Sequence, residues 1–504
     1  MAISNPGGNL NSVAAPQKQV LSTNYLDFTG GSNDWSQQYL PDLMEKEAEV
    51  FGNRTISGFL SQVGAEESMT SDQVIWTEQG RLHLSYIATM AHVTQKADGT
   101  AGGTITIVSD IDGNTSTNVY SQNDHGVRVN DMLLMADSNT TVQGVVTAVN
   151  GTTGSISVGF YGANTASAAG ITATTASALR VLVYGSEYAK GEAYNRAAGT
   201  SATAHTANEP QFKSFSNKPI ILKDFYHISG SDTSRIGWVE ITGEDGQNGY
   251  LWYLKAEGDT RSRFSDYLEM AMLESITGTP GSTLLDSELY GAAGRTLGTE
   301  GLFAAINSRG NVTTGVTGVN PATDLAEFDA ILAEFDNQGA IEENMMFVNR
   351  ATSLAMDDML ASMNSYGAGG TSYGVFNNSE DMALNLGFSG FRRGSYDFYK
   401  SDFRYLNDKA TRGGINAMDT VNAVRGVIIP AGTSTVYDQQ LGKNLKRPFL
   451  HVRYRASQTD DRRLKSWVTG SVGAVTSSLD AMEIHFLSER CLVTQGANNF
   501  MLMK

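Results

Sequence analysis

Residues 249–278 read GYLWYLKAEGDTRSRFSDYLEMAMLESITG, and this stretch predicts one long helix. Large apolar side chains recur in its second half at the three- and four-residue spacing of a single helix face. Gly278 can adopt the left-handed conformation that ends a helix, and Pro280 prevents continuation. A helix of about 28 residues would be roughly 40 Å long. The core face is predicted to consist of Phe264, Tyr267, Leu268, Met272 and Ile276.

The amino-acid composition limits the classes of protein to which the chain can belong. The 504 residues suffice for two or three domains, and 40% of them are apolar. No window approaches the ~20 apolar residues of a membrane helix, and the first residues lack the basic and apolar regions of a secretory signal. The single cysteine, Cys491, excludes an intramolecular disulfide, and its apolar neighbours favour a buried thiol over a nucleophile. We therefore expect synthesis in a cytoplasm, no membrane association, and stability that depends on packing.

Upstream of the helix the chain divides into three parts. Residues 1–30 are polar and predict either an extended arm that lies on another subunit or an unstructured terminus. Residues 31–72 predict short helices, the first over 41–51. Residues 73–235 are predicted to form one long excursion, a segment that leaves the main part of the fold and returns to it. Within this segment, residues at about 97–184 predict a small all-β barrel or sandwich. The hairpin signal Asn150-Gly151 lies inside this segment.

Downstream of the helix the pattern is mixed. Residues 236–281 contain the long helix, and the alternation of strand and helix patterns over 282–425 predicts an α+β domain. The best-defined short helix there covers 324–338, with Thr323 as its N-cap and Gly339 after its end. Residues 426–504 predict closing strands that pack on the long helix, because apolar and polar residues alternate in FLHVRYR and MEIHFL. The apolar face of the short helix is predicted to consist of Leu325, Phe328, Leu332 and Phe335.

A basic stretch, residues 443–465, stands out in a chain whose net charge is −17. A nucleic-acid groove is one interpretation, but proteins dedicated to nucleic acids usually carry a basic excess overall. A solvated surface is another. We favour ion pairs between subunits with acidic patches such as Glu342-Glu343, since such charges set specificity and register. The candidate intersubunit charges are Arg453, Arg455, Arg462 and Arg463.

Motifs for catalysis, metals or cofactors are missing from the sequence. The seven histidines include no HExxH motif, and there is no GxSxG, phosphate-binding loop or paired cysteine. Residues 110–114, DIDGN, resemble the opening of a calcium loop but lack its sixth-position glycine and closing glutamate, which favours a plain turn. The sequence therefore predicts no enzyme, no cofactor and no metal site.

The order of parts resembles the major capsid protein of tailed bacteriophages (Caudoviricetes), which has the Hong Kong 97 (HK-97) fold. Three stretches look like those of phage capsid proteins, and the sequence as a whole is similar to the capsid proteins of crAss-like phages. The three stretches are YGSEYAKGEAYNRAAG at 184–199, SFSNKPIILKDFYHISGSDTSRIGW at 214–238 and EFDAILAEFDNQGAIEENMMFVNRATSLAMDDML at 327–360.

The resemblance implies a role for each part. Residues 1–30 would be the N-terminal arm and 73–235 the E-loop, here with an inserted β domain that the family's simple hairpin lacks. The peripheral (P) domain would combine 31–72, 236–281 and 426–504, and the axial (A) domain would be 282–425. The arm and 185–215 would clasp neighbours, and loops such as 366–376 would meet other copies around the five-fold and six-fold axes. No residue matches the cross-linking chemistry of the type member, so no cross-link is expected.

The function that follows from the resemblance is structural. The chain would assemble in the host bacterial cytoplasm, as hexamers and pentamers, into the icosahedral virion head that encloses double-stranded DNA. Portal, scaffolding and auxiliary or decoration proteins would be its partners, and DNA would be held without sequence-specific binding. Two alternatives stay open: a cytoplasmic α+β enzyme with a β accessory domain, and an encapsulin-type compartment shell protein. The oligomeric state distinguishes a capsid subunit from the enzyme.

Overall fold

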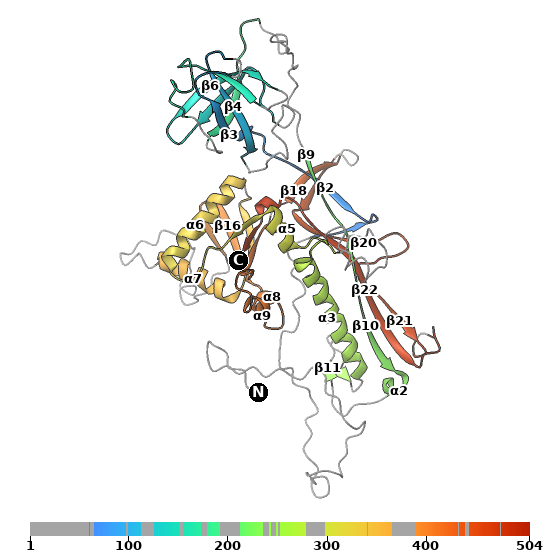
Figure 1. Cartoon of the computed structure of the whole chain (residues 1–504). Helices are drawn as coiled ribbons and strands as arrows, with labels where there is room; N and C mark the ends of the chain where they lie inside the picture. The colour runs from blue at the N-terminus through green and yellow to red at the C-terminus, as the bar shows by residue number, and fades with distance from the viewer. Residues whose placement is uncertain are drawn as a thin grey trace. The chain divides into compact units, whose positions relative to one another are not determined.

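The computed structural model divides the chain into two compact units (Figure 1). The first unit combines Met1–Trp76 with Phe215–Lys504, and the second is Thr77–Ser214. The structure describes residues 60, 65–96, 99–111, 125–150, 155–172, 179–191, 212–234, 241–242, 248–249, 252–278, 298–339, 341–364, 390–431, 433–438, 443–473 and 475–504.

A five-stranded sheet organises one half of the first unit. Its order is β1-β20-β22-β10, and β21 also pairs with β22. β1 runs parallel to β20, whereas β10, β20 and β21 all run antiparallel to β22. Alternate residues of β22 face opposite sides of the sheet, so Met482, Ile484 and Phe486 share one buried face, as their alternation predicts. The strands are β1 (Ala65–Met69), β10 (Ile220–Ser229), β20 (Leu450–Arg455), β21 (Lys465–Gly470) and β22 (Ala481–Thr494).

The long helix α3 (Trp252–Glu274) lies along β10 and β22 (Figure 1). Its 23 residues span about 35 Å. Phe264 and Leu268 are buried in one apolar cluster with residues of β22, and the ring centroids of Phe264 and Phe486 are 6.0 Å apart. Met272 is buried further along the same helix, in a second cluster. Three of the five predicted core positions of this helix are therefore buried.

The other two core predictions are wrong, since Tyr267 is 44% exposed and Ile276 is 74% exposed. Tyr267 is about a quarter turn away from the stripe through Phe264 and Met272, because each residue advances a helix by roughly 100°. Ile276 lies beyond the helix, which ends at Glu274 instead of at the predicted Gly278. The chain leaves the helix there because the backbone N–H of Gly301 donates to the Ser275 carbonyl at 2.8 Å, which ties this point to the start of α5.

A six-stranded mixed sheet organises the other half of the first unit, in the order β13-β23-β17-β14-β16-β15. β14 runs parallel to β16 and antiparallel to β17. β17 and β23 come from the predicted closing segment, so the boundary expected at residue 425 does not separate the two sheets. The strands are β13 (Asn311–Thr313), β14 (Glu343–Val348), β15 (Gly390–Arg393), β16 (Tyr396–Asp402), β17 (Gly426–Pro430) and β23 (Met501–Met503).

Helices cover both faces of this sheet. Met346 and Val348 of β14 are buried in the cluster that contains α6 and α7, whereas Phe347 between them joins the cluster that contains α5 and α8. This half of the unit therefore has three layers. The helices are α5 (Leu302–Arg309), α6 (Pro321–Gln338), α7 (Arg350–Asn364), α8 (Arg404–Asn407) and α9 (Arg412–Asn416), with the short η2 (Ala497–Asn499) and, after β10, α2 (Gly230–Thr233).

Helix α6 is the predicted short helix with an earlier start. Asn320 caps it, because its side chain accepts from the Ala322 N–H at 2.9 Å, so the predicted cap Thr323 lies inside the first turn. Gly339 adopts the left-handed conformation at its end, with φ of 66°, as expected. Phe328 and Phe335 are fully buried, and Leu325 and Leu332 pack against the same cluster while partly buried. The buried Ile331 belongs to this face and was not among the predicted residues.

The second unit contains a closed antiparallel barrel of six strands in the order β3-β4-β7-β6-β5-β8. β5, β6 and β7 form a meander and β8 returns beside β5, which is a Greek key. The predicted hairpin at Asn150 lies between β6 and β7, and the Asn150 N–H donates to the Ser155 carbonyl at 2.9 Å. The barrel begins at Ser85, earlier than the expected 97. The strands are β3 (Ser85–His92), β4 (Gly103–Asp110), β5 (Asp131–Ala136), β6 (Thr141–Val149), β7 (Ser155–Phe160) and β8 (Leu179–Ser186).

Three two-stranded sheets complete the described structure: β2 (Val74–Gln79) with β9 (Phe212–Asn217), β11 (Ile241–Thr242) with β12 (Asn248–Gly249), and β18 (Thr433–Asp438) with β19 (Lys443–Pro448). Several predictions lie outside the described residues. These are the arm at 1–30, the helix at 41–51, the loop at 366–376 and most of 185–215.

Candidate interaction surfaces

Three aromatic rings lie in one row across the five-stranded sheet, on the side opposite α3. The antiparallel registers place Phe225 of β10 and Trp467 of β21 on either side of His485 of β22. The ring centroids of Trp467 and His485 are 5.2 Å apart, and those of Phe225 and His485 are 6.1 Å apart, both pairs being stacked. Phe225 is 58% exposed and Trp467 37% exposed. We call Phe225, His485 and Trp467 the aromatic row.

A carboxylate lies beside the aromatic row, in the next position along β22. Glu483 is opposite His227 of β10 and Thr469 of β21. Its Oε1 lies 3.4 Å from His227 Nδ1, and its Oε2 lies 3.6 Å from His485 Nε2. The hydroxyl of Thr469 is 2.8 Å from the same nitrogen of His485. One acidic group thus lies between two imidazoles, and Lys223 of β10 and Lys465 of β21 lie on the same side of the sheet.

The outer edge of β10 adds backbone groups to this surface. In the described part of the chain β10 pairs with β22 alone, and the sheet ends at β10. Its ten residues alternate between half-buried and exposed, and Ile221 shares the exposed side with Phe225. A long, partly apolar edge strand offers a row of N–H and C=O groups to a further strand. Among the described residues, α3 covers one side of the sheet, and no strand pairs with the outer edge of β10.

The four candidate intersubunit arginines all have acidic partners within the chain, and their pairing with a second copy stays a prediction. Arg453 NH2 lies 2.8 Å from Glu67, and Arg462 Nε lies 2.6 Å from Glu489. Arg463 contacts Glu66, and Arg455 contacts both Asp72 and Glu489.

The physical reason is the parallel pairing of β1 with β20, which sets Glu67 directly opposite Arg453. This pairing could not be predicted from the sequence, because β1 and β20 are far apart along the chain. The hydrogen bond to Asp72 raises the pKa of the Arg455 guanidinium. These pairs are partly exposed to solvent, so each contributes little to stability. The sequence analysis did not single out the aromatic row. The only sequence signal for that row was the alternation of its strands.

Among the described residues, no group of three or more His, Cys, Asp or Glu side chains is arranged to hold a metal ion. No helix in the described part of the chain is long and apolar enough to cross a membrane. Cys491 is fully buried, and burial raises the pKa of its thiol to about 12, as suits the predicted structural thiol. Asp110 ends β4, and the residues after Ile111 in the DIDGN segment are not described.

Comparison with known proteins gives resemblances among solved structures alone. No family model matches the chain, and no curated protein matches it. The solved structures that it resembles come from bacteriophages.

A chain of Microbacterium phage Oxtober96 is 8% identical with a TM-score of 0.37, over 93% of this chain and 96% of that chain. The capsid structure of the cyanophage P-SCSP1u is 8% identical with a TM-score of 0.32, over 61% of this chain and 79% of that chain. The mature capsid of bacteriophage PhiM1 is 10% identical with a TM-score of 0.30, over 61% of this chain and 77% of that chain. At these identities and TM-scores, the function has to be argued from the chain's own surfaces.

Proposed function

We propose that this chain is the major capsid protein of a tailed double-stranded DNA bacteriophage, with the HK-97 fold, and that its function is to assemble with copies of itself into an icosahedral head. The observation that carries the proposal is the side of the five-stranded sheet opposite α3, with its aromatic row and the edge of β10, which has no strand partner among the described residues. Exposed aromatic and apolar surface that lies next to an open strand edge is typical of a protein–protein interface.

The stiffness of the element behind this surface supports the proposal. α3 packs against the opposite side of the same sheet, and Phe264 and Leu268 of the helix are buried among residues of β22. A shell subunit must keep its contact surfaces in fixed orientations, because small angular errors accumulate around a closed shell. A sheet backed by a helix of about 35 Å meets this requirement. The two largest apolar clusters of this unit consist of buried side chains that pack its layers against one another.

The domain roles follow as part of the same proposal. The sheet with α3 would be the P domain, the three-layered half the A domain, and the segment that carries the barrel the E-loop. Residues 1–30 and 185–215 would clasp neighbours, and the loop 366–376 would contact other copies at the symmetry axes. Scaffolding, portal and decoration proteins would be the partners. The net charge of −17 would keep packed DNA from adhering to the shell.

The experiment is electron microscopy of the purified chain, with its mass in solution measured in parallel. Rings, tubes, sheets or closed polyhedral shells of many copies are expected. Phe225→Ala and Trp467→Ala should reduce assembly, because each removes exposed ring surface from the side of the sheet opposite α3. Met418→Ala is the matched control, since Met418 is 89% exposed and lies outside this sheet. A compact monomer or dimer that never assembles, even with phage scaffolding protein added, would refute the proposal and favour the enzyme.

A further inference from the structure

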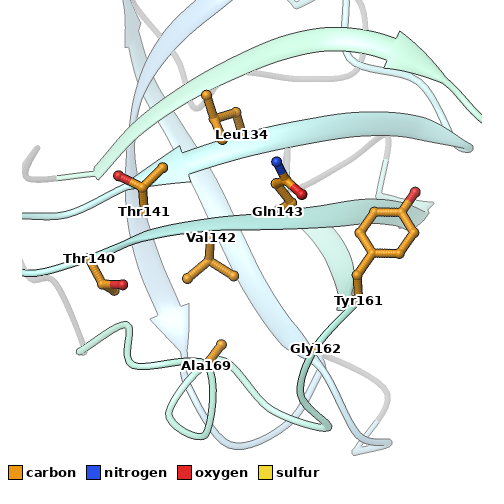
Figure 2. A pocket seen from close by; sticks show the side chains of 8 residues that line it. All are labelled: Leu134, Thr140, Thr141, Val142, Gln143, Tyr161, Gly162 and Ala169. Atoms are coloured by element: carbon orange, nitrogen blue, oxygen red, sulfur yellow. The ribbon is translucent and has the colours of Figure 1, made fainter.

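The barrel carries a groove on its outer surface, beside the turn between β5 and β6. Figure 2 shows the side chains that line it, and its volume is 460 Å³. This volume lies within the range of roughly 300–1,000 Å³ that is common for small-molecule sites. One wall is β6 with the turn before it, and the other is the segment that follows β7. The residues used in the argument are Thr140, Thr141, Gln143, Tyr161 and Ala169.

The two walls are fixed to each other by one carboxylate. Asp137 Oδ1 accepts from the backbone N–H groups of Asn139 and Thr140, both at 2.8 Å, which shapes the turn. Its Oδ2 accepts from the Thr172 N–H at 3.2 Å, which attaches the segment after β7. These hydrogen bonds, that from Asn139 first, lower the pKa of Asp137, so the carboxylate stays charged. Because the fold supplies the link, the groove exists before any ligand arrives.

The segment after β7 is also anchored in the barrel core. Ala166 and Ile171 are fully buried there, and the Ser167 N–H donates to the Val93 carbonyl at 2.9 Å. Between these anchors, Ala169 reaches the groove. A wall that is held at both ends and in the middle keeps its shape when the groove is empty. Preformed walls reduce the conformational entropy that the protein must lose when a ligand binds.

One aromatic ring and one amide form the end of the groove (Figure 2). Tyr161 is 52% exposed, and its hydroxyl donates to the Glu187 carboxylate, which orients the ring. The Tyr161 N–H faces the Gln143 carbonyl at 3.4 Å, so the ring and the exposed Gln143 side chain are neighbours. The site therefore offers a ring face, an amide that both donates and accepts, and the threonine hydroxyls.

Charge selects the kind of ligand. None of the residues that line the groove is charged, and two carboxylates, Asp137 and Glu187, hydrogen-bond to its walls. An anion would be repelled by both carboxylates, and a purely apolar ligand would bury the amide and the hydroxyls without partners. A neutral polyhydroxylated ligand satisfies all the groups, since its C–H faces pack on the ring and its hydroxyls bond to the amide. We propose that this groove binds a neutral saccharide chain.

Isothermal titration calorimetry of the full chain tests the proposal. The neutral probes are cellohexaose, maltohexaose, xylohexaose, mannohexaose and chitohexaose, and oligogalacturonate is the anionic comparison. At least one neutral probe is expected to bind at millimolar concentration or below, and oligogalacturonate is expected to bind at least tenfold more weakly, about 1.4 kcal/mol. Failure of every neutral probe to bind would overturn the proposal, as would a preference for oligogalacturonate.

Variants locate the binding on the barrel. Tyr161→Ala and Gln143→Ala should each weaken the affinity about tenfold, because each removes one side of the ligand's contacts. Tyr161→Phe should keep most of the affinity, since the ring face remains. Tyr399→Ala on β16 is the matched control, because Tyr399 is also 52% exposed but belongs to the other unit. Binding that survives both groove variants, or that falls equally in the control, would overturn the proposal whatever the assembly state of the chain.

Discussion

Replacing Asn217 tests how the first unit is held together. This buried side chain, 4% exposed, stands at the end of β9 and joins two distant segments. Its Nδ2 donates to the carbonyls of Leu492 at 2.6 Å and Glu300 at 3.0 Å. Its Oδ1 accepts from the N–H of Glu300 at 2.9 Å and from the hydroxyl of Thr299 at 3.1 Å. One amide thus connects the central strand β22 to the segment that enters α5.

The magnitude follows from the groups that lose a partner. Asn217→Ala leaves the Leu492 carbonyl and the donors at 299 and 300 without their partner, and each buried unsatisfied group costs about 1–3 kcal/mol. Since neighbouring groups relax partly, we expect a total loss of about 2–5 kcal/mol in the free energy of unfolding. Asn217→Asp keeps the shape but turns a donor into an acceptor that faces two carbonyl oxygens. We expect it to be at least as destabilising as the alanine variant.

Differential scanning calorimetry is the suitable assay, because the two units can melt separately and the barrel transition serves as an internal reference. The first-unit transition should shift down in both variants. Asn422→Ala is the matched control, since the Asn422 side chain hydrogen-bonds to Asp419 at the exposed surface, and it should change stability by less than about 0.5 kcal/mol. If both Asn217 variants resemble Asn422→Ala, the inferred role of the amide is wrong.

Three further predictions concern the described core. Phe264→Ala should lower the free energy of unfolding by about 3–5 kcal/mol, measured by chemical denaturation. Tyr267→Ala on the same helix should lower it by well under half of that amount, because only Phe264 is buried. Equal losses in the two variants would contradict the assigned helix face. Burial and the hydrogen bond to Asp336 raise the pKa of Tyr396 to about 12, above the value of about 10 in an unfolded chain. The wild-type protein should therefore be more stable than Tyr396→Phe below pH 10, and this difference in stability should disappear as the pH rises toward 12. A difference that grows over this pH range would mean that the pKa of Tyr396 is lowered in the folded state. Cys491 should not react with a thiol reagent at neutral pH until the protein is unfolded with denaturant, when one equivalent should react; rapid native labelling would place the thiol at the surface.

The elements that local pattern determines could be predicted from the sequence. Strand spacing and Asn150-Gly151 predicted a β domain, because a hairpin signal acts over a few residues. The stripe through Phe264 and Leu268 predicted the buried side of α3, and Gly339 marked the end of α6. In each case the residues that determine the element are close together in the sequence, or the element needs only an apolar surface to pack against, whichever residues supply it.

The remaining features depend on partners that are distant in sequence. The exposure of Ile276 follows from the bond between Ser275 and Gly301, and the internal pairing of Arg453 follows from the position of β1. The aromatic row requires three strands to be in register, and no single strand carries that information. The groove on the barrel arises where two turns meet, so its residues have no common pattern in the sequence.

The pairing of β1 with β20 also sets the order of events during synthesis. An ion pair connects Arg455 of β20 to Asp72, just after β1, and the two residues are separated by 383 positions. The barrel lies between them in the sequence. Among the described residues its strands pair only with one another, so we expect it to fold on the ribosome soon after it emerges. The body sheet must wait for β22, since β10, β20 and β21 all pair with that strand. The nascent chain is therefore expected to carry a folded barrel while the five-stranded sheet is still incomplete. The aromatic row cannot form until β22 has been translated. If the proposed assembly through this surface is correct, nascent copies on neighbouring ribosomes would have no completed surface through which to associate prematurely.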